Sequence, residues 1–277
     1  MKTLKFEEFL KEEFNVGKIG IDNLDHYLDD MSKGFKDKLF FLDKLNLDVL
    51  VDFGSADGQM LNYLHKLKPK MTLIGYDIDE DMIKESKKKY PDIHFTDKWE
   101  EVLRLLKNKG VNNTKGILLS SVIHEVYSYS GGKNIKKFWN EQVFNNIFDY
   151  VVIRDMIPSS KFNNMNILDV KTIREKSDPK YLQDFEEEWG SIDDNFRILL
   201  HWLLKYKYTD NWDRELKENY LPVTLEYLKK KRIPSNWSIM YEDHYVYDYI
   251  KSQIKKDFGV DIEEPTHLNM IIKNNKH

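Results

Sequence analysis

The sequence contains no cysteine, which excludes disulfide bonds and thiolate metal sites. No apolar run approaches the roughly 18–20 residues that a membrane-spanning helix requires. The opening stretch, MKTLKFEEFLKEEF, is charged throughout and lacks the apolar core of a signal peptide. Internal repeats and low-complexity tracts are also absent from the sequence. These absences favour a cytoplasmic protein with no membrane partner.

The composition is that of a folded globular protein. Of its 277 residues, 41% are hydrophobic and 13% are aromatic, which excludes global disorder. This length suits one core with insertions, or a core with a cap. A net charge of −4 provides no general attraction for nucleic acid, although a local basic face is compatible with it.

Strand-like and helix-like segments alternate along the first 155 residues. The predicted strands are 48–53, 71–76, 92–95, 116–121 and 149–154. The predicted helices between them are 58–67, 80–89, 98–108 and 134–147. Because the strands are almost continuously apolar, this alternation predicts an α/β fold with a parallel sheet covered on both faces.

The remaining segments extend this core at both ends. Helical spacing is seen at 4–15 and 30–46, and residues 165–232 are mostly helical in pattern. Two further strands, 237–242 and 267–273, are predicted on either side of a helix near 247–257. The predicted domains are N-terminal helices (1–46), a core (47–160 with 233–277) and a helical cap (161–232).

A glycine-rich turn follows the first predicted strand, in the stretch VLVDFGSADGQM that begins at Val49. A turn of this kind brings backbone close to a ligand at the carboxyl edge of a sheet. The spacing Gly54-x-Ala56-x-Gly58 lacks the third glycine of the dinucleotide fingerprint, and Asp52 stands just before the turn. An ordinary tight turn between a strand and a helix is the alternative interpretation.

This arrangement, D-x-G-x-(small)-x-G, resembles motif I of the class I S-adenosylmethionine-dependent methyltransferases. The resemblance implies a seven-stranded sheet that is parallel except for strand seven, which is antiparallel and inserted between strands five and six. It also implies that Gly54, Ser55, Ala56 and Gly58 pack against the methionine part of S-adenosyl-L-methionine. Asp52 would help to hold the amino group of this cofactor, and Ala56 stands where the family more often has glycine.

An acid also ends the second predicted strand, about twenty residues beyond the glycine turn. A carboxylate at the position of Asp77 can accept both hydroxyls of a ribose, and Ile78 and Asp79 follow it as in the methyltransferase family. Asp79 is predicted to be the N-cap of the next helix. After strand three, Asp97 matches the family's acid near the adenine amino group, or it caps the helix that begins near Trp99.

The chemistry is expected after strand four, where the sequence reads SSVIHEVY from Ser120. Ser120 and Ser121 belong to the predicted cofactor site. The absence of proline here argues against the DNA amino-methyltransferase pattern, and the segment looks more like the small-molecule branch of the family. His124 is predicted either to act as a base or to bond a backbone group, and Glu125 either to contact substrate or to cap a helix.

The family's topology brings distant residues to one rim of the sheet. His124, Arg154, Asp155, His244 and His267 would converge there, although His244 and His267 could each lie in a solvated loop. The predicted catalytic residues are His124, Glu125, Asp155 and His267. No metal site is predicted, because the histidines include no closely spaced pair.

The cap is expected to cover the substrate. Residues 181–250 hold 15 aromatic residues, which suit stacking on a planar substrate or the core of the cap itself. The same stretch has 9 Lys/Arg against 14 Asp/Glu, which disfavours binding to duplex DNA. The basic run 229–232 is either the cationic end of a helix or a phosphate contact.

The sequence therefore predicts a methyltransferase that uses S-adenosyl-L-methionine and acts on an oxygen or nitrogen of a small or medium-sized acceptor. One alternative is an RNA or nucleotide methyltransferase, read through the aromatic cap and the basic run. Another alternative is a non-catalytic binding or regulatory protein with the same fold. The presence of both Asp52 and Asp77 argues against this last reading. The sequence indicates neither the acceptor nor the oligomeric state.

Overall fold

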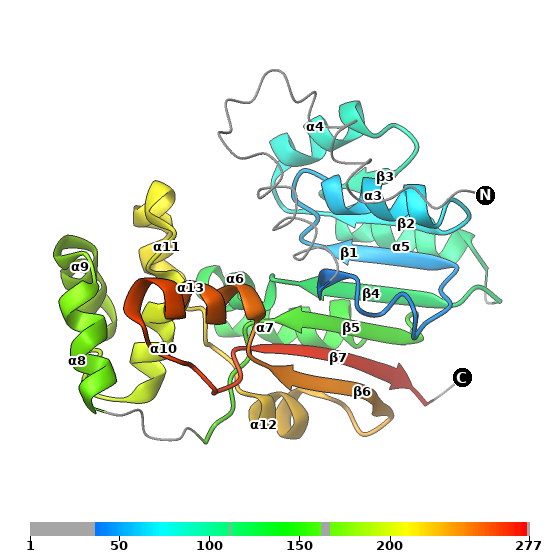
Figure 1. The fold of residues 1–277 in the computed structure, drawn as a ribbon. Helices are drawn as coiled ribbons and strands as arrows, with labels where there is room; N and C mark the ends of the chain where they lie inside the picture. Colours follow the sequence, from blue (N-terminus) through cyan, green and yellow to red (C-terminus); the bar gives the residue numbers. More distant parts are fainter. Residues whose placement is uncertain (1–36, 111, 162–166, 276–277) are drawn as a thin grey trace.

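A seven-stranded sheet forms the centre of the protein, in a computed structural model that describes residues 37–110, 112–161 and 167–275. Its strand order is β3-β2-β1-β4-β5-β7-β6 (Figure 1). The strands are β1 (Val49–Phe53), β2 (Thr72–Tyr76), β3 (His94–Thr96), β4 (Lys115–Ser120), β5 (Tyr150–Asp155), β6 (Trp237–Tyr245) and β7 (His267–Asn274). The predicted helix 4–15 lies outside the described residues.

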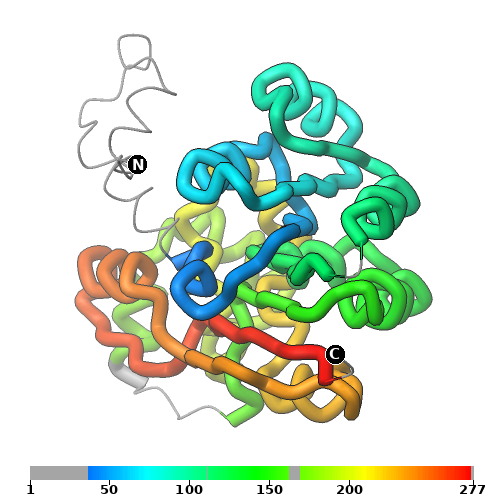
Figure 2. Tube along the Cα trace, turned by 90° about the vertical axis from the view of Figure 1, so that its right-hand side faces the viewer, coloured from blue at the N-terminus to red at the C-terminus, as the bar shows by residue number. Residues whose placement is uncertain are grey.

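The first five strands are parallel, whereas β7 runs antiparallel to both of its neighbours, β5 and β6. Figure 2 shows β6 and β7, in orange and red, side by side along one edge of the molecule. This order, with the antiparallel strand inserted last, is that of the class I methyltransferase fold. The predicted fold class is confirmed.

The helices fall into two groups along the chain. Those between the sheet strands are α3 (Gln59–Leu67), α4 (Glu80–Lys89), α5 (Trp99–Asn108), α6 (Ile123–Tyr129), α7 (Gly132–Lys137), the π-helix η1 (Phe138–Val143) and α13 (Asp248–Phe258). Those between β5 and β6 are α8 (Ile167–Lys176), α9 (Pro179–Trp189), α10 (Phe196–Lys205), η2 (Thr209–Asn211), α11 (Trp212–Lys217), α12 (Leu225–Tyr227) and η3 (Leu228–Arg232).

Alternating side chains of the strands supply a core on each face of the sheet. Val49, Val51 and Phe53 of β1 belong to the cluster that contains α5, η1 and α12, whereas Leu50 belongs to the cluster with α3 and α4. Asp52 follows Leu50 by two positions and so points to the same face. The sheet is therefore covered on both sides, as its apolar strands predicted.

The cap has a hydrophobic core of its own, separate from the two clusters on the sheet. Helices α8–α11 lie beyond the carboxyl ends of the parallel strands (Figure 1). Helix α13, which connects β6 to β7, buries Ile250, Ile254 and Phe258 in this same cluster. The sheet and cap are thereby linked through the C-terminal part of the chain, while the exact domain division stays a prediction.

Two predicted helices differ from the structure. Of the helix predicted at 30–46, the described part is helical only at 37–38 and forms turns from 39 to 44, where Leu39 and Phe41 are both buried. The helix predicted at 134–147 is instead the short α7 followed by η1. The wider π-helix buries Phe138 and Val143, five positions apart, on one face.

Strand β6 is longer than predicted and continues to Tyr245, with a register shift between Ile239 and Tyr241. Among the described residues, no helix has the length and apolar composition needed to span a membrane.

Candidate active site

The glycine turn after β1 is held against the end of β2 by backbone hydrogen bonds. The N–H groups of Gly54 and Ser55 both donate to the carbonyl of Tyr76, at 2.8 and 3.0 Å. Gly54 has φ +84°, and Ala56 has φ +45°, which is uncommon for a residue with a side chain. The chain therefore keeps a strained backbone at this point, which is a feature typical of functional sites.

Both glycines of the turn are required by packing. A Cβ on Gly54 would lie 2.8 Å from Val122 Cγ2, and a Cβ on Gly58 would lie 2.5 Å from the ring of Phe95. Gly58 also has φ +75° and stands at the N-cap of α3. Gly58 thus has a structural reason to be glycine, and its contact with a cofactor stays a prediction.

Asp77 connects the turn with the start of α4. Its Oδ2 accepts a hydrogen bond from Ala56 N at 2.8 Å, and its Oδ1 accepts one from Asp79 N at 3.0 Å. These bonds fix the carboxylate, yet each oxygen keeps a further lone pair for a ligand hydroxyl. Asp79, two residues further on, accepts from the N–H groups of Asp81 and Met82, which confirms it as the N-cap of α4.

A cleft of about 340 Å³ opens beside the turn, at the carboxyl ends of β1, β2 and β4. This volume is within the range of small-molecule sites. Gly54 and Asp77 line it together with Ile78, whose side chain is 80% exposed and offers a free apolar surface. Its remaining lining residues include Val122 and Glu125 and side chains from α6, α7 and η1.

Asp52 is buried at the end of β1, and its Oδ1 has no hydrogen-bond partner among the described residues. Burial raises the pKa of this carboxyl to about 7, an effect that the positive charge of Lys38 opposes and the negative charge of Asp77 reinforces. A buried carboxylate oxygen without a donor is energetically unfavourable. A buried carboxyl group without a donor, such as Asp52, is what a site for a positively charged ligand would contain.

Other predicted cofactor residues lie nearby in different settings. Ser120, at the end of β4, has a buried Oγ without a partner among the described residues, as does Ser55. Ser121 has φ +56°, and its Oγ accepts a hydrogen bond from Arg154. Asp97 does not cap α5, whose N-cap is Lys98, and it lines a separate hollow beside α4. Its role toward adenine stays a prediction.

His124 and Asp155 form a buried pair at the ends of β4 and β5. His124 Nδ1 lies 2.8 Å from Asp155 Oδ1, and Asp155 also accepts hydrogen bonds from the N–H groups of Ile123 and Met156. The predicted alternative for His124, a side-chain bond to a backbone group, is not what the structure has. Because an ionised carboxylate only accepts, Nδ1 carries a hydrogen, and Nε2 is the ring nitrogen at which the second proton is gained or lost.

Electrostatics favour the charged form of this pair. Burial lowers the pKa of His124, but the charge and hydrogen bond of Asp155, with Glu125 and Glu218, outweigh it and raise the pKa above its ordinary value. Burial raises the pKa of Asp155, but His124 and the two backbone N–H groups lower it overall. The two groups thus stabilise each other's charge.

The structure adds a residue that the sequence did not reveal, Glu218, in the segment that follows α11. Its carboxylate is buried, and its Oε1 accepts hydrogen bonds from Tyr129 at 2.9 Å and from Arg214 Nε at 2.8 Å. Arg214 also reaches Glu125 Oε1 at 3.2 Å. Glu125 therefore bonds the cap and not the backbone of its own helix, and the cap meets α6 through these charged groups.

His267 and His244 both lie near the rim of the sheet, but each side chain already bonds or packs against other residues. His267 is buried against the rings of Tyr245 and Tyr247, and its Nδ1 lies 2.9 Å from Thr266 Oγ1. Burial and the charges of Arg154 and His124 hold its pKa well below the ordinary value, so it is neutral. His244 Nε2 bonds the carbonyl of Ile157 at 2.8 Å, which ties β6 to the start of the insertion.

Most of the cap's aromatic residues form its own core. Trp202 and Trp212 are buried within the cap, and Trp189 donates to the carbonyl of Leu216. The basic run is partly paired as well, since Lys229 bonds Glu242 and Arg232 lies over the rings of Tyr127 and Tyr227. Few aromatic faces of the cap are therefore available to stack on a planar substrate.

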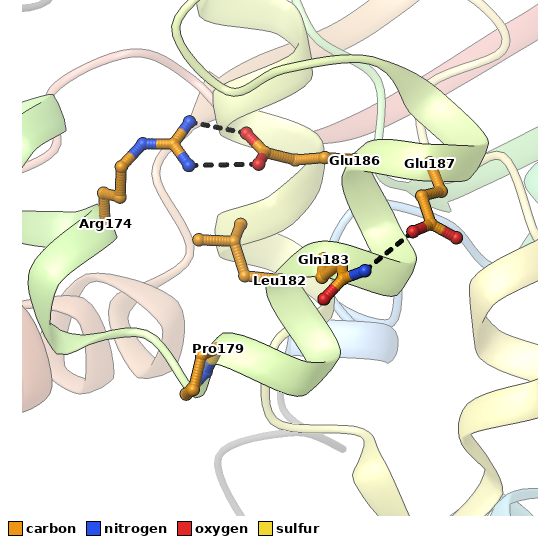
Figure 3. Close-up of a pocket in the computed structure, with 6 residues that line it drawn as sticks. All are labelled: Arg174, Pro179, Leu182, Gln183, Glu186 and Glu187. Carbon is orange, nitrogen blue, oxygen red and sulfur yellow. Dashed lines mark hydrogen bonds and ion pairs between the residues drawn. The ribbon is translucent and has the colours of Figure 1, made fainter.

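An open hollow of about 500 Å³ lies on the cap, between α8 and α9 (Figure 3). Its charged groups are already paired. Arg174 makes two hydrogen bonds to Glu186 and one to Asp193, and Gln183 bonds Glu187. We assign no function to this hollow, because its polar groups stabilise the cap.

No family model and no curated protein matches the chain. Solved structures of methyltransferases match over most of its length. The plantazolicin methyltransferase BamL, crystallised with a desmethylPZN analog and SAH, is 11% identical and covers 98% of this chain and 90% of its own, with a TM-score of 0.45. The methyltransferase domain of bacterial CtHen1 is 11% identical, with coverages of 88% and 98% and a TM-score of 0.47.

A SAM-dependent methyltransferase from Archaeoglobus fulgidus is 16% identical, covers 88% of this chain and 94% of its own, and has a TM-score of 0.43. Because these TM-scores lie below 0.5, the fold assignment rests on the strand order of the sheet and not on the matches.

Proposed function

We propose that the protein is an S-adenosyl-L-methionine-dependent methyltransferase that acts on an oxygen or nitrogen of a small or medium-sized acceptor. One observation carries this proposal. The buried Asp52, whose Oδ1 has no partner among the described residues, directly precedes the strained glycine turn, and the anchored Asp77 lines the cleft of suitable volume beside that turn. Two acids in these positions suit a ligand that has an ammonium group at one end and a ribose at the other.

The residues present fit this cofactor. Asp77 would accept the ribose hydroxyls, Asp52 would face the amino group, and the exposed side chain of Ile78 would cover the adenine. Gly54 and Ser120 would line the remaining wall. When bound, the cofactor supplies a methyl group on a positively charged sulfur, which is already activated for transfer.

The chain's own residues would then align the acceptor. Glu125 lines the cleft, and a ring nitrogen of His124 lies within 4.8 Å of a carboxylate oxygen of Glu125, so both belong to the side where an acceptor would enter. Asp155 would hold the His124 ring in one orientation, and the neutral His267 would have a lesser role in that orientation. His124 would either remove a proton from the acceptor or fix the acceptor's position.

The burial of the cap's tryptophans supports a small acceptor over RNA. A protein that binds single-stranded nucleic acid without sequence preference combines exposed aromatic faces with a continuous basic groove. Here, the cap's aromatic residues are largely internal, and the basic run 229–232 is partly paired. We therefore place RNA or a nucleotide second among the acceptors.

Calorimetry with S-adenosylhomocysteine and with NAD tests the cofactor. We expect saturable binding of the former and none of the latter. A protein that binds neither ligand would contradict the methyltransferase proposal. Incubation of cell extract with the protein and a cofactor labelled in its methyl group then tests the activity. Transfer of label would separate an enzyme from a non-catalytic relative that binds the cofactor but transfers nothing.

A further inference from the structure

We propose that His124, Glu125 and Glu218 bind a divalent metal ion at the mouth of the cofactor cleft. One ring nitrogen of His124 and one carboxylate oxygen from each glutamate lie within 4.8 Å of one another. Among the described residues, this is the one cluster of histidine, cysteine and acidic side chains with such geometry. Imidazole and carboxylate together suit ions such as Mn²⁺, Co²⁺ and Zn²⁺.

The state of His124 provides an independent argument. The residue is only 6% exposed, and its Nδ1 is bonded to Asp155. Within the described part of the chain, no group forms a hydrogen bond with Nε2. Metal-binding histidines usually donate their second ring N–H to a carboxylate, which fixes the tautomer and the ring orientation. Asp155 has this position, so Nε2 is presented as a ligand nitrogen.

Both glutamates also have an unused oxygen. Tyr129 and Arg214 bond Oε1 of Glu218, and Arg214 bonds Oε1 of Glu125. Across the residues that the structure describes, Oε2 of neither glutamate accepts a hydrogen bond. Each side chain can therefore ligate through Oε2 without losing a hydrogen bond at that atom.

Negative charge exceeds positive charge around His124. The carboxylates of Asp155, Glu125 and Glu218 surround His124, while one guanidinium, that of Arg214, approaches them. The Arg214 side chain is 59% exposed, so it can swing away without losing much packing. A divalent ion would neutralise the remaining charge, and its open coordination positions would take water or an acceptor oxygen.

The three proposed ligands come from two parts of the fold. His124 and Glu125 lie in α6, next to the cofactor cleft, and Glu218 comes from the cap. Lys205 donates to the carbonyls of Glu215 and Glu218, and so fixes the backbone that carries this third ligand. The ion would thus join the cap to the sheet at the point where the acceptor enters. This role in positioning an acceptor rests on the proposed function, whereas metal binding itself does not.

Titration of the full-length protein with Mn²⁺, by calorimetry and electron paramagnetic resonance, tests the site. We expect one saturable site, with binding at least about 10-fold weaker in Glu218→Gln and His124→Gln. Asp155→Asn should weaken it by about 10–100-fold, although Asp155 would not touch the ion. Glu187→Gln, which removes an exposed carboxylate elsewhere on the cap, should leave it unchanged.

Arg214→Gln provides the sharpest variant, because it should tighten Mn²⁺ binding by removing a competing cation. Misfolding cannot produce this result, so the test holds even if the variants at buried positions are unstable. Weaker binding in Arg214→Gln, or equal binding in wild type and Glu218→Gln, would overturn the proposal. So would a cluster that binds methylammonium but none of Mn²⁺, Co²⁺ and Zn²⁺, since it would be the site of a cationic acceptor.

S-adenosylhomocysteine affinity, measured on the same samples, separates the two proposals. Intact cofactor binding without metal binding would overturn only the metal site. Metal binding without cofactor binding would overturn the methyltransferase proposal instead.

Discussion

The backbone N–H of Ala56 donates a hydrogen bond to Asp77 Oδ2 at 2.8 Å, across 21 residues of sequence. The acid after β2 therefore holds the turn after β1 in place, in addition to any contact that it makes with a ligand. The two parts of the proposed cofactor site are fixed relative to each other before a ligand arrives.

Substitution of Asp77 by Asn should weaken the binding of S-adenosylhomocysteine by about 1.5–3 kcal/mol, because charge-assisted bonds to the ribose hydroxyls are lost. Isothermal calorimetry measures this change. Asp79→Asn is the matched control, since Asn caps a helix as well as Asp does and the removed charge is the same. Equal losses in both variants would show that Asp77 has no specific contact with the ribose.

Asp52 should make the stability of the protein depend on pH. Its pKa is raised to about 7 in the folded state, so the folded protein holds a proton that the unfolded chain releases near pH 4. Stability from this group therefore falls as pH rises between those values. Relative to wild type, Asp52→Asn should gain about 3 kcal/mol in unfolding free energy between pH 5 and pH 8.

Urea unfolding at the two pH values measures this gain. A constant difference between wild type and Asp52→Asn would show that the carboxyl titrates normally. If Asp52 faces the cofactor's amino group, the same variant should also bind S-adenosylhomocysteine more weakly at pH 8.

Gly58 and Gly110 form a matched pair for stability, because both have a left-handed backbone, with φ +75° and φ +78°. A Cβ at Gly110 meets nothing within 4 Å, whereas at Gly58 it meets the Phe95 ring. Gly110→Ala should lose about 1 kcal/mol from backbone strain alone. Gly58→Ala should lose a further 1–3 kcal/mol, roughly, from overpacking. Chemical denaturation of both variants provides the comparison, and equal losses would refute the packing argument.

His201, buried in the cap, should destabilise the protein in acid. Burial, with the charges of Lys205 and Arg197, lowers its pKa to about 3, although the backbone at Glu218 opposes this. Below about pH 6.5 the unfolded chain takes up a proton that the folded state refuses, so stability falls as pH falls. His201→Gln keeps an acceptor for the N–H of Tyr220 and removes this dependence.

Between pH 7.5 and pH 5, wild type should lose about 2 kcal/mol more than His201→Gln does. Thermal unfolding at both values checks this difference. The same loss in both proteins would mean that the protonation of His201 is not linked to unfolding.

The sequence predicted those features that depend on neighbouring residues. The apolar strands, the glycine turn and the N-cap at Asp79 are all encoded within a few positions, and each predicted strand has a counterpart in the structure. The order of the last two strands was predicted only through the family resemblance. The pattern of residues within a strand does not determine which strands it will pair with.

The sequence did not predict contacts that form only when distant elements pack against each other. Glu218 is 93 positions beyond Glu125, in a segment without a motif, and only the packing of the cap brings the two together. The association of α13 with the cap has the same cause, since its apolar face is compatible with either core. The π-helix η1 also escaped prediction, because the five-residue spacing of its buried Phe138 and Val143 was not separated from an ordinary helical pattern.

The insertion of β7 between β5 and β6 has a consequence for biosynthesis. As the chain leaves the ribosome, β6 emerges before the strand that must separate it from β5, so it has no permanent place in the sheet. The cap helices and β6 are complete while the sheet is still open at β5. Closure of the sheet must await the synthesis of β7, and final folding of this half of the molecule therefore follows the synthesis of that strand.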